Sequence, residues 1–161
     1  MGGEILSSRV EGETLVIETT EGTESYDAKF MVAALLVYVA RGSGSIEPEE
    51  SARMIELIEA HFNLQGAESL ELLTRAMSEM ADKPTLPGLL RELAPTLSEG
   101  DKEDIALMAL KVVAADGKRH FSELEQFNRA MEAVGVRPEI VHRAFDRYFA
   151  ETMPIDSEDK V

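Results

Sequence analysis

Two segments of the chain, 73 positions apart, repeat one pattern, and this repeat constrains the fold more than any other feature. Each copy has a very apolar stretch, a glycine turn at Gly44 or Gly117, and then an amphipathic stretch. The copies run from Ala33 to Leu64 and from Ala106 to Val136. Two apolar helices packed side by side and covered by the amphipathic ones share a single core. The repeat therefore predicts an all-α fold built from two pseudo-repeated helical hairpins.

Helical spacing continues outside the repeat and predicts a compact bundle of about seven helices over residues 27–152. Asp27 and Ser98 have the N-cap preference for two of these helices, and Pro48 and Pro138 suit the first turns of two others. The two most apolar helices have almost no polar face, so their residues should lie in the core. The residues expected to be buried are Leu35, Leu36, Val39, Leu107, Leu110 and Val113.

Residues 1–26 differ from the rest and predict a short extended arm. The run from Thr14 to Thr20 is rich in β-branched residues, and Gly12 and Gly22 lie at turn positions on either side. This pattern indicates a β-hairpin or a small meander. An isolated hairpin is marginal in water, so the arm must dock on the helices or pair with a second copy, which would form a homodimer. Residues 153–161 are acidic and predict a disordered tail.

Charge and composition exclude several classes of function. The net charge of −15 argues against nucleic acid and against anionic membranes, because phosphate contacts need Lys and Arg. The chain has no Cys, which excludes disulfides and thiolate metal sites. It has neither a signal-peptide pattern nor an apolar run long enough to insert into a membrane, so we expect a cytoplasmic protein. Its acidity fits cation binding, a protein partner, or solubility alone.

The second glycine turn is the best candidate site. Asp116 ends one predicted helix and Glu123 lies in the first turn of the next, so a tight loop brings two carboxylates together. Carboxylate oxygens are the ligands that Ca²⁺ and Mg²⁺ take in proteins. A structural reading also explains these residues: Gly117 supplies a left-handed cap, and Glu123 faces the positive end of its helix.

Glu50 is the equivalent of Glu123 in the first copy and is the third candidate metal ligand. If the two copies pack together, Glu50 faces Glu123 across the pseudo-symmetry axis. Here too a simpler reading exists. Glu50 belongs to an acidic helix start with Glu47 and Glu49, and a solvated position near the helix dipole accounts for all three without a ligand.

The turn sequences VARGSGSIEPEE (residues 39–50) and VAADGKRHFSELE (residues 113–125) resemble the repeated Ala-x-x-Asp-Gly-x-Ile-x-x-x-Glu pattern of the TerB family. The resemblance covers residues 27–151. The sequence departs from the pattern at Ser43, where the family has Asp, and at Arg119, where it has Ile. The resemblance implies a compact helical fold, a role in a bacterial stress-response assembly of the tellurite-resistance type, and a divalent cation at the acidic loop positions.

These observations lead to three readings of function. The first is a non-enzymatic TerB-like binding module that has a protein partner and holds a divalent cation, Ca²⁺ or Mg²⁺, at the Asp116–Gly117 loop. The second is a protein-interaction scaffold that needs no metal. The third is a hydrolase with a carboxylate metal centre, which requires more converging ligands than the sequence offers. No catalytic residue and no organic cofactor is expected.

Overall fold

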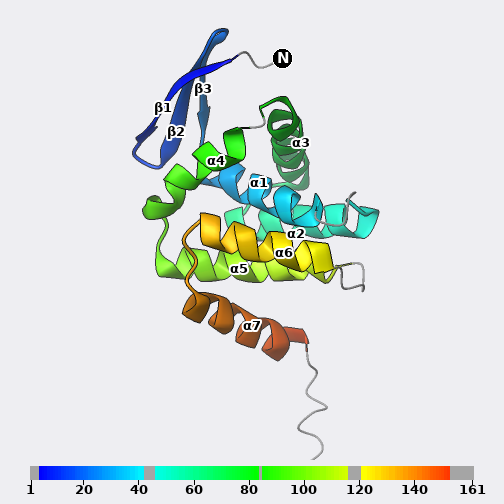
Figure 1. Ribbon diagram of the computed structural model, residues 1–161. Coiled ribbons are helices and arrows are strands. Elements are labelled where there is room, and N and C mark those ends of the chain that lie inside the picture. Colours follow the sequence, from blue (N-terminus) through cyan, green and yellow to red (C-terminus); the bar gives the residue numbers. More distant parts are fainter. Residues whose placement is uncertain (1–3, 42–45, 84, 116–120, 153–161) are drawn as a thin grey trace, which may run out of the picture.

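The computed structural model describes residues 4–41, 46–83, 85–115 and 121–152, except for the side chains at positions 87, 121–123 and 152. Within these ranges the chain forms a three-stranded sheet followed by seven α-helices and one 3₁₀ helix. Figure 1 shows the sheet at one end of the molecule, beside α3 and α4, and α7 at the opposite end. The predicted helical body is confirmed, and the N-terminal arm adds a small sheet to it. None of the helices in these ranges is long and apolar enough to cross a bilayer.

The N-terminal sheet is an antiparallel meander with the strand order β1 (Ile5–Glu11), β2 (Thr14–Thr19), β3 (Gly22–Tyr26). The β-branched run forms its central strand, as predicted. Leu15 and Ile17 are two positions apart in β2 and therefore lie on the same face of the sheet. Both are fully buried in the core that the helices form. The meander therefore docks on its own helices, because one face of β2 is apolar and needs cover.

The turn between β1 and β2 requires a glycine. Gly12 has a φ of 65°, in the left-handed region where a side chain is disfavoured, and a Cβ at this position would meet no other atom within 4 Å. We expect Gly12→Ala to lower the free energy of unfolding by about 1 kcal/mol through backbone strain alone. Urea denaturation measures this change. Gly100→Ala is the matched control, because Gly100 lies in an α-helix without positive φ. A Gly12 variant as stable as the Gly100 variant would contradict the assignment of strain to this turn.

Helices α1 (Ala28–Ala40) and α5 (Glu99–Val113) form the centre of the bundle. Asp27 caps α1 by accepting a 2.9 Å hydrogen bond from the Phe30 N–H, and Ser98 caps α5 by accepting one of 3.0 Å from the Asp101 N–H. The two helices contact each other, as the repeat predicted. All six residues expected in the core are buried: Leu35, Leu36, Val39, Leu107, Leu110 and Val113.

Amphipathic helices cover this centre. They are α2 (Pro48–Phe62), α3 (Gly66–Asp82), α6 (Phe121–Ala133) and α7 (Pro138–Thr152). Helices α2, α3 and α6 all contact α1, and α7 packs on α5. Between α3 and α5 the chain forms the short helix α4 (Leu86–Leu90), which continues into the 3₁₀ helix η2 (Arg91–Thr96). An α-helix does not continue through this segment, because Pro95 lies within η2 and cannot donate a helical hydrogen bond.

The helix bounds agree with the predicted duplication. A shift of 73 positions carries α1 (residues 28–40) onto residues 101–113, and α5 ends at the same residue. The same shift carries α2 (residues 48–62) onto residues 121–135, and α6 begins at the same residue. That the two hairpins superimpose in space stays a prediction, because Gly44 and Gly117 lie outside the described residues.

Candidate functional site

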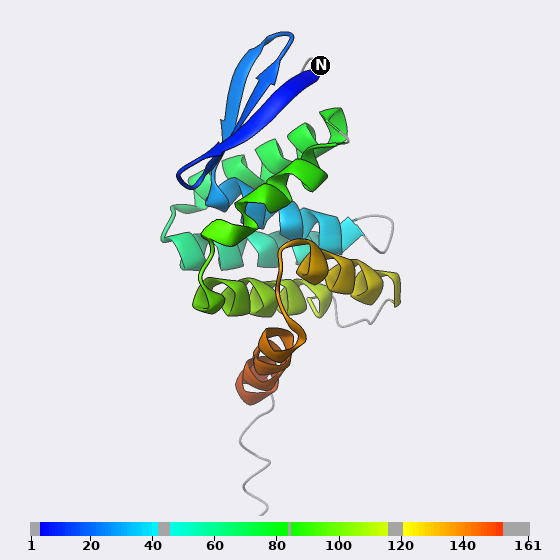
Figure 2. The ribbon, with the colours of Figure 1, turned by 60° about the vertical axis from the view of Figure 1, so that its left-hand side comes forward.

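The two helical hairpins bring four helix ends together at one end of the body. In both views, the C-terminal ends of α1 and α5 and the N-terminal ends of α2 and α6 lie on this side (Figures 1 and 2). Two of the three candidate ligands, Asp116 and the side chain of Glu123, fall outside what the structure describes. Glu123 itself lies in the first turn of α6. The convergence of the three carboxylates therefore stays a prediction.

Glu50 is the candidate ligand whose side chain the structure describes, and it is fully buried. It lies in the first turn of α2, where its Oε1 accepts a 2.9 Å hydrogen bond from the Glu47 N–H. This bond satisfies one of the free donors at the helix start. Glu49 next to it is exposed. The reading of Glu50 as part of a solvated helix start is therefore wrong, because its side chain is fully buried although it lies in the first turn of α2.

The second carboxylate oxygen of Glu50 has no hydrogen-bond partner. Oε2 is buried and contacts no donor among the described residues. A buried polar atom left unsatisfied costs about 1–3 kcal/mol, and more when it carries charge. Buried charges in proteins are therefore paired or coordinate metals. The atom is available to a cation or a proton. Among the described residues, no group of three or more His, Cys, Asp or Glu side chains could hold a metal ion.

A second buried polar cluster lies far from Glu50 and joins the sheet to α3. The Lys83 Nζ is 2.5 Å from Glu79 Oε1 and 3.3 Å from Glu24 Oε1, although its side chain is only 2% exposed. The Tyr26 hydroxyl lies 2.8 Å from the same two carboxylates. Arg75 covers the Tyr26 ring at 5.0 Å from its centroid. Each group has a partner within the cluster, so the cluster anchors the sheet to α3.

The pKa shifts in this cluster follow from the same contacts. Burial raises the pKa of the Tyr26 hydroxyl, and its hydrogen bonds to Glu24 and Glu79 raise it further. Burial alone also raises the pKa of Glu79, but hydrogen bonds from Lys83 and Tyr26 outweigh burial and place this pKa below its ordinary value. For Lys83, burial lowers the pKa, and the contacts with Glu79 and Glu24 raise it above the ordinary value. Glu79 and Lys83 are therefore charged at neutral pH, and Tyr26 is neutral.

One feature of the sequence indicates part of this cluster. Glu79 and Lys83 are four positions apart near the end of a helix, a spacing that places the two side chains together. The contacts of Lys83 with Glu24 and of Glu79 with Tyr26 join residues more than 50 positions apart, and no periodic pattern reports them.

Comparison with known protein families gives a match to the family described as tellurite resistance protein TerB, over residues 29–155. The matched range begins in α1, includes all seven α-helices, and leaves out the sheet. Comparisons with characterised proteins and with solved structures give no match. Because the family model covers well over half of the chain, the chain belongs to the tellurite resistance protein TerB family.

Proposed function

We propose that this TerB-family chain is a non-enzymatic binding module, and that the end of the bundle formed by the two hairpin turns holds a divalent cation through Glu50. One observation carries the proposal: the Oε2 of Glu50 is buried and has no partner among the described residues. A hard cation suits a buried carboxylate oxygen best, because the cation neutralises the negative charge and accepts the lone pairs of the oxygen.

The predicted remaining ligands are Asp116 and Glu123. Asp116 follows α5 in the sequence, and Glu123 lies in the first turn of α6. The start of α6 lies at the same end of the bundle as the start of α2 (Figure 1). Oxygen ligands from both hairpins suit Ca²⁺ or Mg²⁺, which take carboxylates and waters. When bound, the ion would supply positive charge between the two hairpins and join them. The proposed protein partner then recognises a bundle end whose shape depends on the cation.

Glu50→Gln tests the cation site because it keeps the shape of the side chain and removes its charge. We expect Ca²⁺ or Mg²⁺ to raise the melting temperature of the unmutated protein, because a ligand bound only to the native state stabilises it by about 2.7 kcal/mol at 100 times its Kd. Glu50→Gln should lose this rise, and calorimetry should show loss of binding. Glu49→Gln is the matched control: it removes the same charge from an exposed neighbour and should keep the cation effect.

The outcome separates the alternatives. If neither cation binds the unmutated protein, and Glu50→Gln melts at the same or a higher temperature, Glu50 has only a structural role at the start of α2. The module is then a scaffold that needs no metal. If Glu49→Gln loses as much binding as Glu50→Gln, the cation interacts with a diffuse acidic surface and not with a site. The hydrolase reading predicts cation-dependent turnover of ester or phosphate substrates, which the proposed module lacks.

A further inference from the structure

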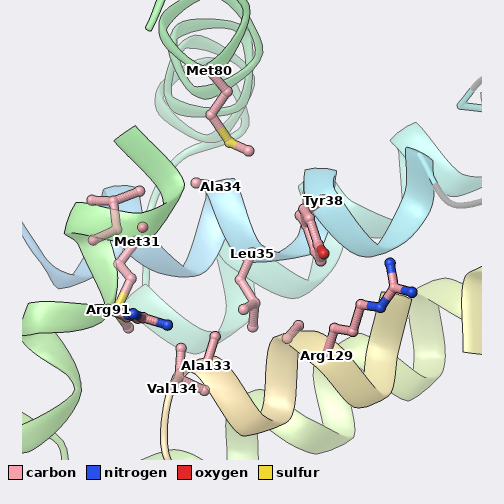
Figure 3. Close-up of a pocket in the computed structure, with 12 residues that line it drawn as sticks. Met31, Ala34, Leu35, Tyr38, Met80, Arg91, Arg129, Ala133 and Val134 are labelled. Atoms are coloured by element: carbon pink, nitrogen blue, oxygen red, sulfur yellow. The ribbon is translucent and has the colours of Figure 1, made fainter. Parts of the chain in front are cut away.

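A pocket on the side of the bundle is separate from the Glu50 end and has a different chemistry. Its volume is about 170 Å³, and it lies between α1, α3, α4 and α6 (Figure 3). Met31, Leu35 and Tyr38 lie along one face of α1, at the spacing that places side chains on the same side of a helix. Met80 faces them from α3, and Ala133 lies across from them on α6. The inner walls are therefore almost entirely apolar.

Two arginines stand at the rim of this pocket. Arg91 comes from η2 and Arg129 from α6, and Figure 3 shows them on opposite sides, with Leu35 and Ala133 between them. Both are exposed, and neither forms an ion pair with a described carboxylate. The described polar contact of Arg129 is a 3.5 Å approach of its Nη1 to Gln126 Oε1.

Arg91 and Arg129 lack an ion pair with any described residue, although the chain has 31 Asp and Glu against 16 Lys and Arg. Among the described arginines, Arg41 and Arg75 also lack one, but they do not line this pocket. The described arginines that form ion pairs with carboxylates are Arg9, Arg53, Arg137, Arg143 and Arg147. At the pocket, two guanidinium groups are held beside apolar walls with no acidic residue among the lining side chains. Such a place attracts an anion whose remaining surface is apolar.

We infer that this pocket binds a small amphipathic monocarboxylate, with its apolar body in the recess and its carboxylate at Arg91 or Arg129. The size of the body follows from the volume. A cavity of about 150 Å³ lined by aliphatic side chains holds a molecule of the size of benzene, so the recess takes an apolar group of about six to eight carbons. Met31 and Met80 can adjust to its shape, because methionine side chains are flexible and polarizable.

Net charge favours a small monoanion over an acidic protein segment. The chain carries a net charge of −15, which repels a partner with many negative charges. A single carboxylate meets little of this repulsion, because charges farther away than the Debye length of about 8 Å are screened at physiological salt. The two arginines act within contact distance, where screening is weakest.

Hexanoate is the probe for this inference. Hexanol is the matched uncharged compound, and hexylamine is the matched compound of opposite charge. Spectra of the full chain with labelled methionine methyl groups report where each compound binds. Hexanoate should shift the methyl signals of Met31 and Met80 and leave those of Met54 and Met108 in place, since the latter two are buried away from the pocket. A ligand of this size should bind with a Kd of about 0.1–1 mM. The exposed arginines should make hexanoate bind about three- to tenfold more tightly than hexanol.

Two variants test the two halves of the site. Ala133→Phe fills the recess from an exposed position and should abolish binding of both compounds, while Ala60→Phe, on an exposed part of α2, should not. Arg91→Gln combined with Arg129→Gln should reduce the affinity for hexanoate to that for hexanol. Arg53→Gln is the control, because Arg53 pairs with Glu56 and does not line the pocket.

Three results would overturn the inference. One is an equal affinity for hexanoate and hexanol, and another is methyl shifts at Met54 and Met108 as large as those at Met31 and Met80. The third is binding of an acidic peptide with a phenylalanine anchor while the free acids do not bind, which would make the recess a protein-docking site. None of these three results depends on divalent cations. A failure of the pocket inference is therefore distinguishable from a failure of the cation proposal.

Discussion

Replacing Leu36 with Ala should lower the free energy of unfolding by about 2–5 kcal/mol, because it removes a fully buried side chain and leaves a cavity. Leu36 is 0% exposed and lies in α1, the helix that contacts α2, α3, α5 and α6. Because Leu36 is packed between these helices, they can collapse only partly into the space. Urea denaturation measures the loss, and an unchanged dependence on urea concentration would show that the transition has stayed two-state.

Leu70→Ala is the control for this prediction. Leu70 lies on α3 and is 53% exposed, so its truncation should change stability by less than about 0.5 kcal/mol. If the two leucines cost the same, α1 is not the centre of the core. A large effect of Leu36→Ala alone supports the packing of two apolar helices that the repeat predicts.

Replacing Lys83 with Met should cost about 2–4 kcal/mol at neutral pH, because it leaves two partly buried carboxylates without their cation. Lys83 is 2% exposed, and its partners Glu79 and Glu24 are 22% and 29% exposed. Methionine keeps the length of the side chain, so the loss reports the charge contacts more than the packing. Denaturation in urea at pH 7 measures it. Lys29→Met removes an exposed lysine that lies 3.6 Å from Asp27 and should have little effect.

The cost of Lys83→Met should depend on pH. The pKa of Glu79 is lowered in the folded state, so its stabilising contribution is present above its ordinary value of 4.5 and is lost as the pH falls through the lower folded value. Protonation of Glu79 removes its charge, and with it the part of the cost that comes from leaving this carboxylate without a cation. The difference in the free energy of unfolding between the variant and the unmutated protein should therefore be largest at pH 7 and should shrink below about pH 4. A difference that is the same at pH 7 and pH 3 would show that Lys83 acts through packing and not through its charge.

The sequence predicted the core well because α1 and the second half of α5 have almost no polar face. A helical segment that is apolar on nearly all sides must be enclosed, so burial of Leu36 and Leu110 followed without knowledge of any contact. The caps at Asp27 and Ser98 were also predictable, since a cap depends on residues within one turn. The sheet was predicted less completely: the β-branched run of β2 is a strong signal, whereas β1 contains two serines and an arginine.

The candidate sites could be predicted only in part, because they depend on contacts between distant segments. Glu50 looked solvated because Glu47 and Glu49 flank it, and only the packing of α2 shows that Glu50 points inward while Glu49 does not. Arg91 and Arg129 both lie at the rim of the pocket, although they are 38 positions apart in the sequence. Neither arginine belongs to a motif. Their significance lies in the absence of a carboxylate partner among the described residues, which a sequence does not record.

Paramagnetic Mn²⁺ tests the central claim most directly, because it substitutes for Mg²⁺ or Ca²⁺ at oxygen ligands and broadens the signals of nearby nuclei. The account predicts that Mn²⁺ well below the protein concentration broadens the backbone signals of Glu50 and its neighbours at the start of α2 first. Excess Mg²⁺ should restore them, and Glu50→Gln should prevent the broadening. Signals of β1 at the far end of the molecule should stay sharp (Figure 1). Broadening spread evenly over the acidic surface, or unchanged in Glu50→Gln, would contradict a cation site at Glu50.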